Sequence, residues 1–268
     1  MQGIGKAPVL SESDTLLEFV GRLGAARSSV LLLDYDGTLA PFHLDRHRAY
    51  PYPKVLPFIE NIVRTGRTRV VIVTGRPIVE AKALLNPLDH LEIWGAHGME
   101  RILPDGTYRQ IGIDPETAEL LSQAKERVIE AGLLSLAEFK PGGMAIHWRG
   151  MAGRESERVE AEIRDAWTAL AEQPVLKLLK FESGLELRVV RPDKGDAVTT
   201  IIAESDPDTP IAYLGDDLTD EDSFRALNGR GLTVLVRPER RETLAKLWLK
   251  PPHELIGFLE QWLSRISA

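Results

Sequence analysis

The stretch Val30-Leu31-Leu32-Leu33-Asp34-Tyr35-Asp36-Gly37-Thr38-Leu39 decides the fold of this chain. Its run of branched apolar residues is typical of a strand that is buried on both faces of a parallel sheet. The run stops at two aspartates, and ligands of open α/β sheets bind just outside the carboxyl ends of the strands. Asp34 and Asp36 are therefore expected in that crevice. Because neighbouring carboxylates repel each other, the pair suggests a bound cation or a shared proton, although an Asp-Gly turn alone would be common.

Three further segments also place polar or charged residues at the end of an apolar run or at the start of a helix. Residues 69–73 form an apolar run that ends in Thr74-Gly75-Arg76, and Lys194-Gly195-Asp196 begins a helix predicted over residues 197–203. Residues 211–214 form a third apolar run, which ends in Gly215-Asp216-Asp217-Leu218-Thr219-Asp220-Glu221-Asp222. Mg²⁺ prefers hard oxygen ligands and keeps several waters, so a few carboxylates suffice to bind it. A hydroxyl and a lysine are the groups that a transferring phosphoryl group needs around its oxygens.

Periodicity and turn signals predict alternating strands and helices along the rest of the chain. Asp105-Gly106 indicates a hairpin, and Pro115 suits the first turn of a helix that extends to Ala131. Further helices are predicted over 55–63, 78–85, 154–171 and 251–266, and further strands over 91–95, 144–148, 175–181, 185–190 and 232–236.

Composition limits the possible classes of function. The chain has 268 residues and a net charge of −7, which argues against a basic nucleic-acid-binding face. It contains no cysteine, so disulfides and thiolate metal sites are excluded. Residues 1–10 are too short and too polar for a signal peptide, and no apolar run approaches the length of a membrane span. A soluble, cytoplasmic protein without nucleic-acid or membrane partners is expected.

The four clusters, read in order as DYDGTL, VTGR, DKG and GDDLTDE, resemble the motifs of the haloacid dehalogenase superfamily of phosphotransferases. The fuller match is to the trehalose-6-phosphate phosphatases. That family's GDDxTDExxF is matched by residues 215–224, its HGxE by His97-Gly98-Met99-Glu100, and its cap motifs ExK and HxR by residues 138–140 and 147–149. The resemblance implies a Rossmann-like α/β core with a parallel sheet, formed by residues 1–113 and 188–268. It also implies an inserted α/β cap domain of the C2 type over residues 114–187.

The resemblance also implies a set of roles around a phosphoryl group and Mg²⁺. Asp34 would attack phosphorus, Asp36 would act as general acid and base, and Thr74 and Lys194 would bind phosphate oxygens. Spacing alone does not say which aspartate attacks. The implied metal residues are Asp34, Asp36 through its backbone carbonyl, Asp216 and, through metal-bound waters, Asp220; a contact from Asp217 is left open.

The candidate sugar-binding residues come mainly from the cap. They are His97, Gly98, Glu100, Glu138, Lys140, Arg149 and Glu186. Without the resemblance, the charges at residues 138–149 would indicate an edge strand that is protected by charge. Lys140-Pro141-Gly142-Gly143 indicates a turn or bulge there, and its paired glycines suggest that the turn is flexible. His147 is expected to be structural.

The expected activity is that of a magnesium-dependent phosphatase that converts trehalose 6-phosphate, a small-molecule partner, into trehalose and phosphate. Another phosphorylated disaccharide or glycoside, such as sucrose phosphate or mannosyl-phosphoglycerate, is the alternative substrate. A silent sugar-phosphate sensor is disfavoured because all four motifs are intact, and a dehalogenase because it would not need Asp36. Residues 216–220 also match the DDxxD pattern of prenyl-diphosphate enzymes, but those are all-helical and an apolar strand precedes this segment.

Overall fold

The computed structural model describes residues 12–86, 88, 90–181 and 183–267. The prediction about a signal peptide in residues 1–10 lies outside the described residues. Within the described part, no helix is long and apolar enough to cross a membrane.

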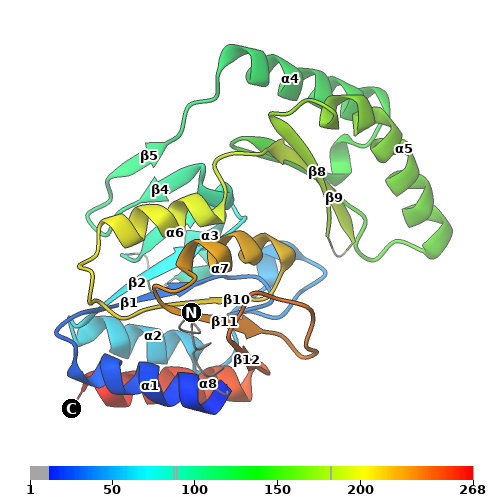
Figure 1. Cartoon of the computed structure of the whole chain (residues 1–268). Coiled ribbons are helices and arrows are strands. Elements are labelled where there is room, and N and C mark those ends of the chain that lie inside the picture. Colours follow the sequence, from blue (N-terminus) through cyan, green and yellow to red (C-terminus); the bar gives the residue numbers. More distant parts are fainter. Residues whose placement is uncertain (1–11, 87, 89, 182, 268) are drawn as a thin grey trace, which may run out of the picture. The chain divides into compact units, whose positions relative to one another are not determined.

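The elements alternate along the chain as an α/β fold requires (Figure 1). The longer helices are α1 (Glu12–Ala25), α2 (Val55–Arg64), α3 (Ile78–Leu85), α4 (Pro115–Glu130), α5 (Gly153–Ala171), α6 (Lys194–Ala203), α7 (Glu221–Leu227) and α8 (His253–Ile266), and the short 3₁₀ turns are η1 (Arg46–Arg48), η2 (Ala96–Gly98), η3 (Leu134–Leu136) and η4 (Leu218–Asp220). The strands are β1 (Ser29–Leu33), β2 (Thr68–Val73), β3 (Glu92–Gly95), β4 (Glu100–Ile102), β5 (Tyr108–Gln110), β6 (Ala137–Lys140), β7 (Gly143–His147), β8 (Leu176–Phe181), β9 (Gly184–Val189), β10 (Ile211–Gly215), β11 (Leu232–Val236) and β12 (Leu247–Leu249).

The strands form two sheets. One has the order β12-β11-β10-β1-β2-β3-β4-β5, and the other has the order β6-β7-β9-β8. In the first sheet, β1, β10, β11 and β12 pair in parallel, whereas β4 pairs antiparallel with β3 and β5. The predicted α/β class with a mostly parallel central sheet is confirmed. The hairpin predicted at Asp105-Gly106 joins β4 to β5, whose bounds the sequence pattern did not predict.

The described residues group by their contacts into two compact units. Unit 1 contains the residues up to Pro41, Pro51–Val71 and the residues from Val198 onward, and unit 2 contains Phe42–Tyr50 and Ile72–Ala197. These limits differ from the predicted division into 1–113 and 188–268 on one side and 114–187 on the other, because the boundary between the two units falls within β2. The division into a core and a cap stays a prediction.

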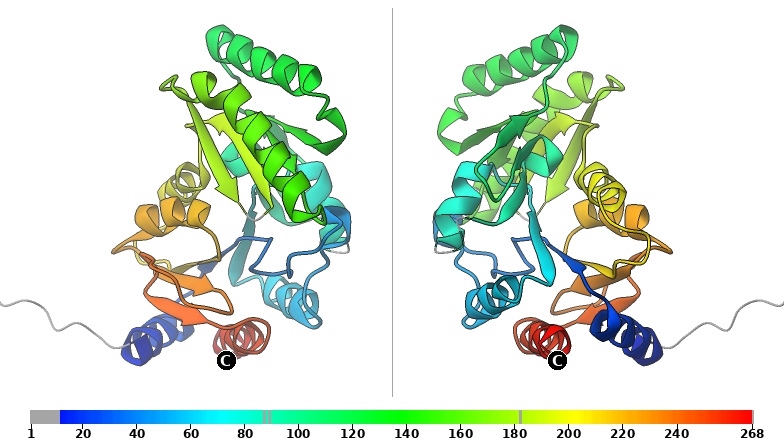
Figure 2. Two further views of the ribbon diagram at one scale, coloured as in Figure 1. Left: turned by 90° about the vertical axis from the view of Figure 1, so that its right-hand side faces the viewer. Right: turned by 90° about the vertical axis from the view of Figure 1, so that its left-hand side faces the viewer.

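Unit 1 is built on strand β1, all five residues of which are buried. Helices α1, α2 and α8 pack together beside it, as both Figure 1 and Figure 2 show. Trp262 of α8 is in ring contact with Phe19 and Phe258, and its indole N–H donates to the hydroxyl of Thr68 at 3.1 Å. The apolar face of α8 therefore serves core packing, as its periodicity predicts.

Within unit 2, helices α4 and α5 pack against each other and against the four-stranded sheet. The apolar core between them includes Met144, Ile146, Leu185 and Leu187. At its centre, Trp167 of α5 is fully buried and donates its indole N–H to the carbonyl of Ala124 at 3.1 Å. Alternate residues of β7 and β9 thus point into an apolar core, which leaves the other face of this sheet free for polar side chains.

That second face carries charged residues in two rows across the sheet. Glu138 of β6 is opposite Ala145 of β7, which in turn is opposite Glu186 of β9. The next row contains Lys140, Gly143 and Arg188. The middle strand contributes only small residues to these rows, so the charged side chains of its neighbours have room to meet. Strand β6 is an edge strand, as the charges at residues 138–149 alone would indicate, but the side chains of Glu138 and Lys140 are largely buried.

The turn between β6 and β7 is tightly packed. Gly142 has φ +75° and lies close to Met99 and Val189, and a Cβ on Gly143 would lie 2.6 Å from the Cβ of Arg188 and 2.8 Å from the carbonyl oxygen of Leu187. The two glycines therefore permit a close approach, which gives them a packing role; the flexibility of the turn stays a prediction.

Because Gly143 lies against β9, we expect alanine to destabilise the protein at this position but not at a glycine that has open space around it. Gly143→Ala forces the backbone of β9 away and is expected to lower the free energy of unfolding by about 1–3 kcal/mol, the usual cost of overpacking. Urea unfolding followed by circular dichroism measures this change. Gly112→Ala is the control, because its Cβ would meet no atom within 4 Å. Equal stabilities of the two variants would contradict the packing role of Gly143.

Candidate functional site

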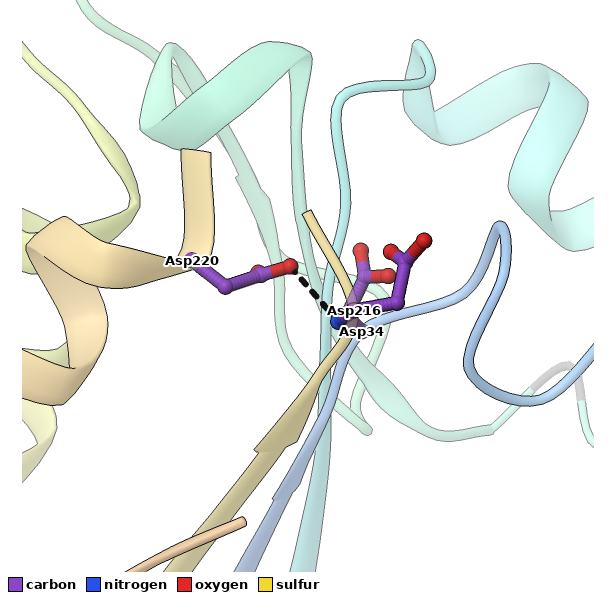
Figure 3. Close-up of side chains that lie close together, drawn as sticks. All are labelled: Asp34, Asp216 and Asp220. Atoms are coloured by element: carbon purple, nitrogen blue, oxygen red, sulfur yellow. Dashed lines mark hydrogen bonds between the residues drawn. The ribbon is translucent and has the colours of Figure 1, made fainter. Parts of the chain in front are cut away.

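Three buried aspartates come together at the carboxyl ends of neighbouring strands in unit 1. Asp34 follows β1 and Asp216 follows β10, and the parallel pairing of these strands continues through a hydrogen bond from the Asp34 N–H to the Leu214 carbonyl at 2.9 Å. Asp34, Asp216 and Asp220 each offer a carboxylate oxygen within 4.8 Å of the others. Figure 3 shows the carboxylates of Asp34 and Asp216 side by side, with that of Asp220 directed at the backbone of Asp216. The structure therefore brings together three of the four predicted metal residues.

The loop after β1 is shaped to admit the Asp216 side chain. Gly37 has φ +81°, which favours glycine, and a Cβ there would lie 2.0 Å from Oδ2 of Asp216. Thr38, one residue later, donates its hydroxyl to Oδ2 of Asp34 at 3.1 Å. The Gly-Thr that follows the two aspartates thus has a specific use: the glycine leaves space for one carboxylate and the threonine orients another.

Asp220 holds its own loop in shape with both carboxylate oxygens. Oδ1 accepts the hydroxyl of Tyr213 at 2.6 Å, and Oδ2 accepts the backbone N–H groups of Asp216 and Asp217, each at 3.0 Å. A Cβ on Gly215 would lie 2.4 Å from Cγ of Asp220, so this approach also requires a glycine. The carboxylate of Asp220 orients the residue that carries Asp216, as expected of a group that supports a metal ligand from behind.

Arg241 also stabilises this loop, and the sequence motifs did not indicate it. Its guanidinium donates to the carbonyl of Asp216 at 3.3 Å and to that of Asp217 at 2.7 Å, and it forms an ion pair with Glu221. Arginine suits this position because its five N–H donors can serve several acceptors at once. No local pattern marks such a residue, since it lies after β11 and reaches back to the loop after β10.

The donor set of this cluster fits Mg²⁺. Buried carboxylates held this close together repel each other, and a hard dication is the partner that carboxylate oxygens favour. The pKa of Tyr52 is raised by burial and by the negative charge of Asp216, which is consistent with an anionic cluster. Asp36 is half-buried. That its backbone carbonyl also binds the metal stays a prediction.

The two remaining catalytic candidates belong to unit 2. Thr74 is fully buried, its hydroxyl accepts the N–H of Arg76 at 3.1 Å, and its carbonyl accepts the N–H of His97 at 3.0 Å. Lys194 is the first residue of α6 and is also buried. Their action on phosphate oxygens stays a prediction.

Four candidate sugar-binding residues form a buried polar cluster in unit 2. Nζ of Lys140 lies 2.6 Å from Glu186, 3.8 Å from Glu138 and 3.4 Å from the carbonyl of Gly75. Burial raises the pKa of Glu138. This effect is outweighed by the charge of Lys140, by a hydrogen bond with His147 and by the charge of Arg46, which together lower the pKa to about 2. Burial likewise opposes ionisation of Glu186, yet Lys140 and His97 hold its pKa well below the ordinary value. Both carboxylates are therefore charged at neutral pH.

His97 enters this cluster from a constrained backbone. Its φ is +57°, and its ring packs against Gly75 so closely that a Cβ on Gly75 would lie only 2.6 Å from Nε2 of His97. Burial and the nearby Arg188 lower the pKa of His97 to about 3, so the ring is neutral at pH 7 although Nε2 lies 3.4 Å from Glu186. Its Nδ1 is buried without a hydrogen-bond partner in the described part of the chain. A non-glycine residue in a left-handed conformation beside unused hydrogen-bonding capacity is typical of a functional site.

The other three sugar candidates are engaged elsewhere in unit 2. The carboxylate of Glu100 accepts the N–H of Ile78, at the start of α3, and the hydroxyl of Tyr108 at 2.8 Å. Gly98 has φ +102° and closely approaches the carbonyl of Asp193. Arg149 donates to the carbonyl of His43 at 2.6 Å. These contacts give Glu100 and Gly98 structural tasks, and direct sugar contact by any of the three stays a prediction.

Comparisons with known proteins identify a matching family and proteins of the same fold. The model of a family described as trehalose-phosphatase matches residues 32–250. The chain is 28% identical over 97% of its length to an uncharacterized glycosyl hydrolase of Mycobacterium tuberculosis, and 30% identical over 91% of its length to a trehalose-phosphate phosphatase of Mycolicibacterium paratuberculosis. It spans only 20% of the first relative and 64% of the second. The solved C-terminal domain of a trehalose-6-phosphate phosphatase from Candida albicans shares the fold, with a TM-score of 0.77 at 18% identity over 98% of this chain and 99% of that one.

The hydroxyl of Tyr213 is expected to support both stability and metal binding. Tyr213→Phe removes a buried donor to a carboxylate, which costs about 1.5–3 kcal/mol of unfolding free energy. It also releases Asp220, so the affinity for Mg²⁺ should fall. Urea unfolding and titration calorimetry with Mg²⁺ measure the two effects. Tyr50→Phe, at an exposed residue, is the control, and a Tyr213→Phe variant that matches it in both assays would contradict the role of Tyr213.

The pKa of His97 predicts a loss of stability in acid. The unfolded chain takes up a proton at His97 below about pH 6.5, whereas the folded chain does so only near pH 3, so the free energy of unfolding falls as pH falls between these values. Between pH 7 and pH 5 this group should account for a loss of about 2 kcal/mol. Urea unfolding at both pH values should show a loss smaller by that amount in His97→Asn, because asparagine tolerates positive φ. The exposed His253→Asn should behave as wild type; an equal loss in all three proteins would show that His97 is not buried and neutral.

Proposed function

Because this chain belongs to the trehalose-phosphatase family, we propose that it is a magnesium-dependent phosphatase that hydrolyses trehalose 6-phosphate to trehalose and phosphate. The observation that carries the proposal is the buried cluster of Asp34, Asp216 and Asp220 at the ends of parallel strands. This cluster supplies hard oxygen ligands where α/β proteins bind their ligands, within the segment that the family model matches.

The proposed reaction gives the two aspartates after β1 the roles that the resemblance to the family implies. A carboxylate oxygen of Asp34 attacks phosphorus, and the bond from phosphorus to the sugar oxygen breaks. Asp36 gives that oxygen a proton, so the sugar leaves as a neutral alcohol and an aspartyl-phosphate remains. Asp36 then takes a proton from water, whose oxygen attacks phosphorus and releases Asp34 and inorganic phosphate. Mg²⁺, when bound by Asp34 and Asp216, would offset the repulsion between the attacking carboxylate and the phosphate oxygens.

Thr74 and Lys194 are proposed to donate to the phosphate oxygens that do not face the metal. Recognition of the sugar is assigned to the buried polar cluster around Glu138, Lys140 and Glu186. Its carboxylates are ionised and oriented, and carboxylates and ammonium groups are suited to the hydroxyls of a neutral sugar. His97 could contribute Nδ1 as an acceptor for one further hydroxyl.

Release of inorganic phosphate from a panel of esters tests the proposal. The panel contains trehalose 6-phosphate, sucrose 6-phosphate, mannosyl-phosphoglycerate and p-nitrophenyl phosphate. We expect the highest kcat/KM on trehalose 6-phosphate, loss of activity in EDTA, and recovery with Mg²⁺. Asp34→Asn should lower kcat by at least about 1,000-fold, as for other nucleophile variants, because an amide is a poor nucleophile.

The exposed Asp165→Asn is the matched control and should keep wild-type activity. Full activity in EDTA would refute the metal assignment. Asp34→Asn activity within tenfold of wild type would refute the covalent mechanism, and a higher kcat/KM on another sugar phosphate would reassign the substrate.

A further inference from the structure

The segment Phe42–Tyr50, which follows the catalytic loop after β1, belongs to unit 2. Its 3₁₀ turn η1 is capped by Asp45, whose carboxylate accepts the N–H of His47 at 3.0 Å. Most of the segment is exposed, and Arg46 is an exception: its side chain is only 19% exposed. The sequence motifs did not single out Arg46.

The guanidinium of Arg46 forms ion pairs with two carboxylates that come from different elements. Its Nη2 forms an ion pair with Glu80 of α3, and its Nη1 forms one with Glu138 of β6. The carbonyl of Arg46 accepts Nη1 of Arg76 at 2.8 Å, which ties the backbone of the segment to the same place. A planar guanidinium can serve two carboxylates in fixed directions, which the point charge of a lysine cannot.

The contacts of Glu138 divide between its two oxygens. Oε2 forms the ion pair with Arg46 and a hydrogen bond with Nε2 of His147 at 2.7 Å. Oε1 lies 3.8 Å from Nζ of Lys140, which is beyond hydrogen-bond distance. Arg46 and His147 thus hold one oxygen and leave the other free to accept a donor.

A second candidate sugar residue contacts the same segment. Nη1 of Arg149 donates to the carbonyl of His43 at 2.6 Å, and its guanidinium lies 5.8 Å from the ring centre of Phe42. Both Glu138 and Arg149 therefore contact Phe42–Tyr50 through polar groups. A segment with only a packing role would not need to engage these two side chains through charged and hydrogen-bonding groups.

We propose that Arg46 is a positioning residue for sugar recognition, which holds Oε2 of Glu138 so that Oε1 faces a hydroxyl of the sugar, with Glu80 anchoring the other half of the guanidinium. The inference rests on the proposed function, because it assumes a phosphorylated sugar as substrate. Without Arg46, only His147 would hold Oε2, so the Glu138 side chain could turn toward the ammonium group of Lys140 and Oε1 would no longer be fixed toward the sugar.

The test measures the ratio of kcat/KM on trehalose 6-phosphate to kcat/KM on p-nitrophenyl phosphate, which has no sugar. Arg46→Met is expected to lower this ratio between about 10- and 100-fold, the effect of a misplaced binding group, mainly through KM for the sugar ester. Arg46→Lys keeps the charge without the fork and should recover only part of the ratio. Glu80→Gln should lower the ratio less, and its effect should largely vanish when Arg46 is already methionine, because the two residues act through one contact.

Arg48→Met is the matched control, because Arg48 lies in the same turn but is exposed, and it should keep the wild-type ratio. Circular dichroism and urea unfolding establish that each variant is folded. An Arg46→Met ratio equal to that of wild type, or complete rescue by Arg46→Lys, would overturn the inference. Wild-type protein that does not prefer trehalose 6-phosphate over p-nitrophenyl phosphate would instead overturn the proposed function.

Discussion

The parallel pairing of β1 with β10 is the constraint on which the rest of unit 1 depends. It brings Asp34 and Asp216 out at the same sheet edge, where each is buried and close to the other. This proximity is possible only because Gly37 has no side chain, since any Cβ there would overlap the Asp216 carboxylate. Tyr213 and Arg241 then hold the loop after β10 through Asp220 and through backbone carbonyls. The fold therefore maintains a concentration of negative charge that a dication would compensate.

The two units handle buried charge in different ways. The carboxylates of unit 1 lie together, an arrangement suited to an added cation. In unit 2 the charges alternate, with Lys140 beside Glu186 and Arg46 beside Glu138, so the cluster is largely neutralised by its own residues. Such an arrangement suits a neutral polyhydroxyl ligand, because the ionised groups remain available as oriented donors and acceptors without attracting a metal.

Small residues make both arrangements possible. In β7, Gly143 and Ala145 stand between charged residues of β6 and β9, and the lack of bulk lets those side chains meet across the sheet. In the loop after β3, His97 takes space that Gly75 leaves open. At each of these positions, a small residue leaves the space that lets side chains from different elements come close together.

The sequence by itself determined the features that depend on local pattern. The apolar run before Asp34 predicts a buried strand, and the order of the motifs predicts that Asp216 and Asp220 join it, because carboxyl ends of parallel strands share one edge. Only the tertiary structure decided which partners each polar side chain takes. Glu100 belongs to a motif that suggests sugar binding, yet its carboxylate accepts the N–H of Ile78 at the start of α3. Arg46 belongs to no recognised motif, yet it joins two carboxylates distant in sequence. The physical reason is that such contacts depend on side-chain direction and on segments that approach only after folding, which residue spacing does not encode.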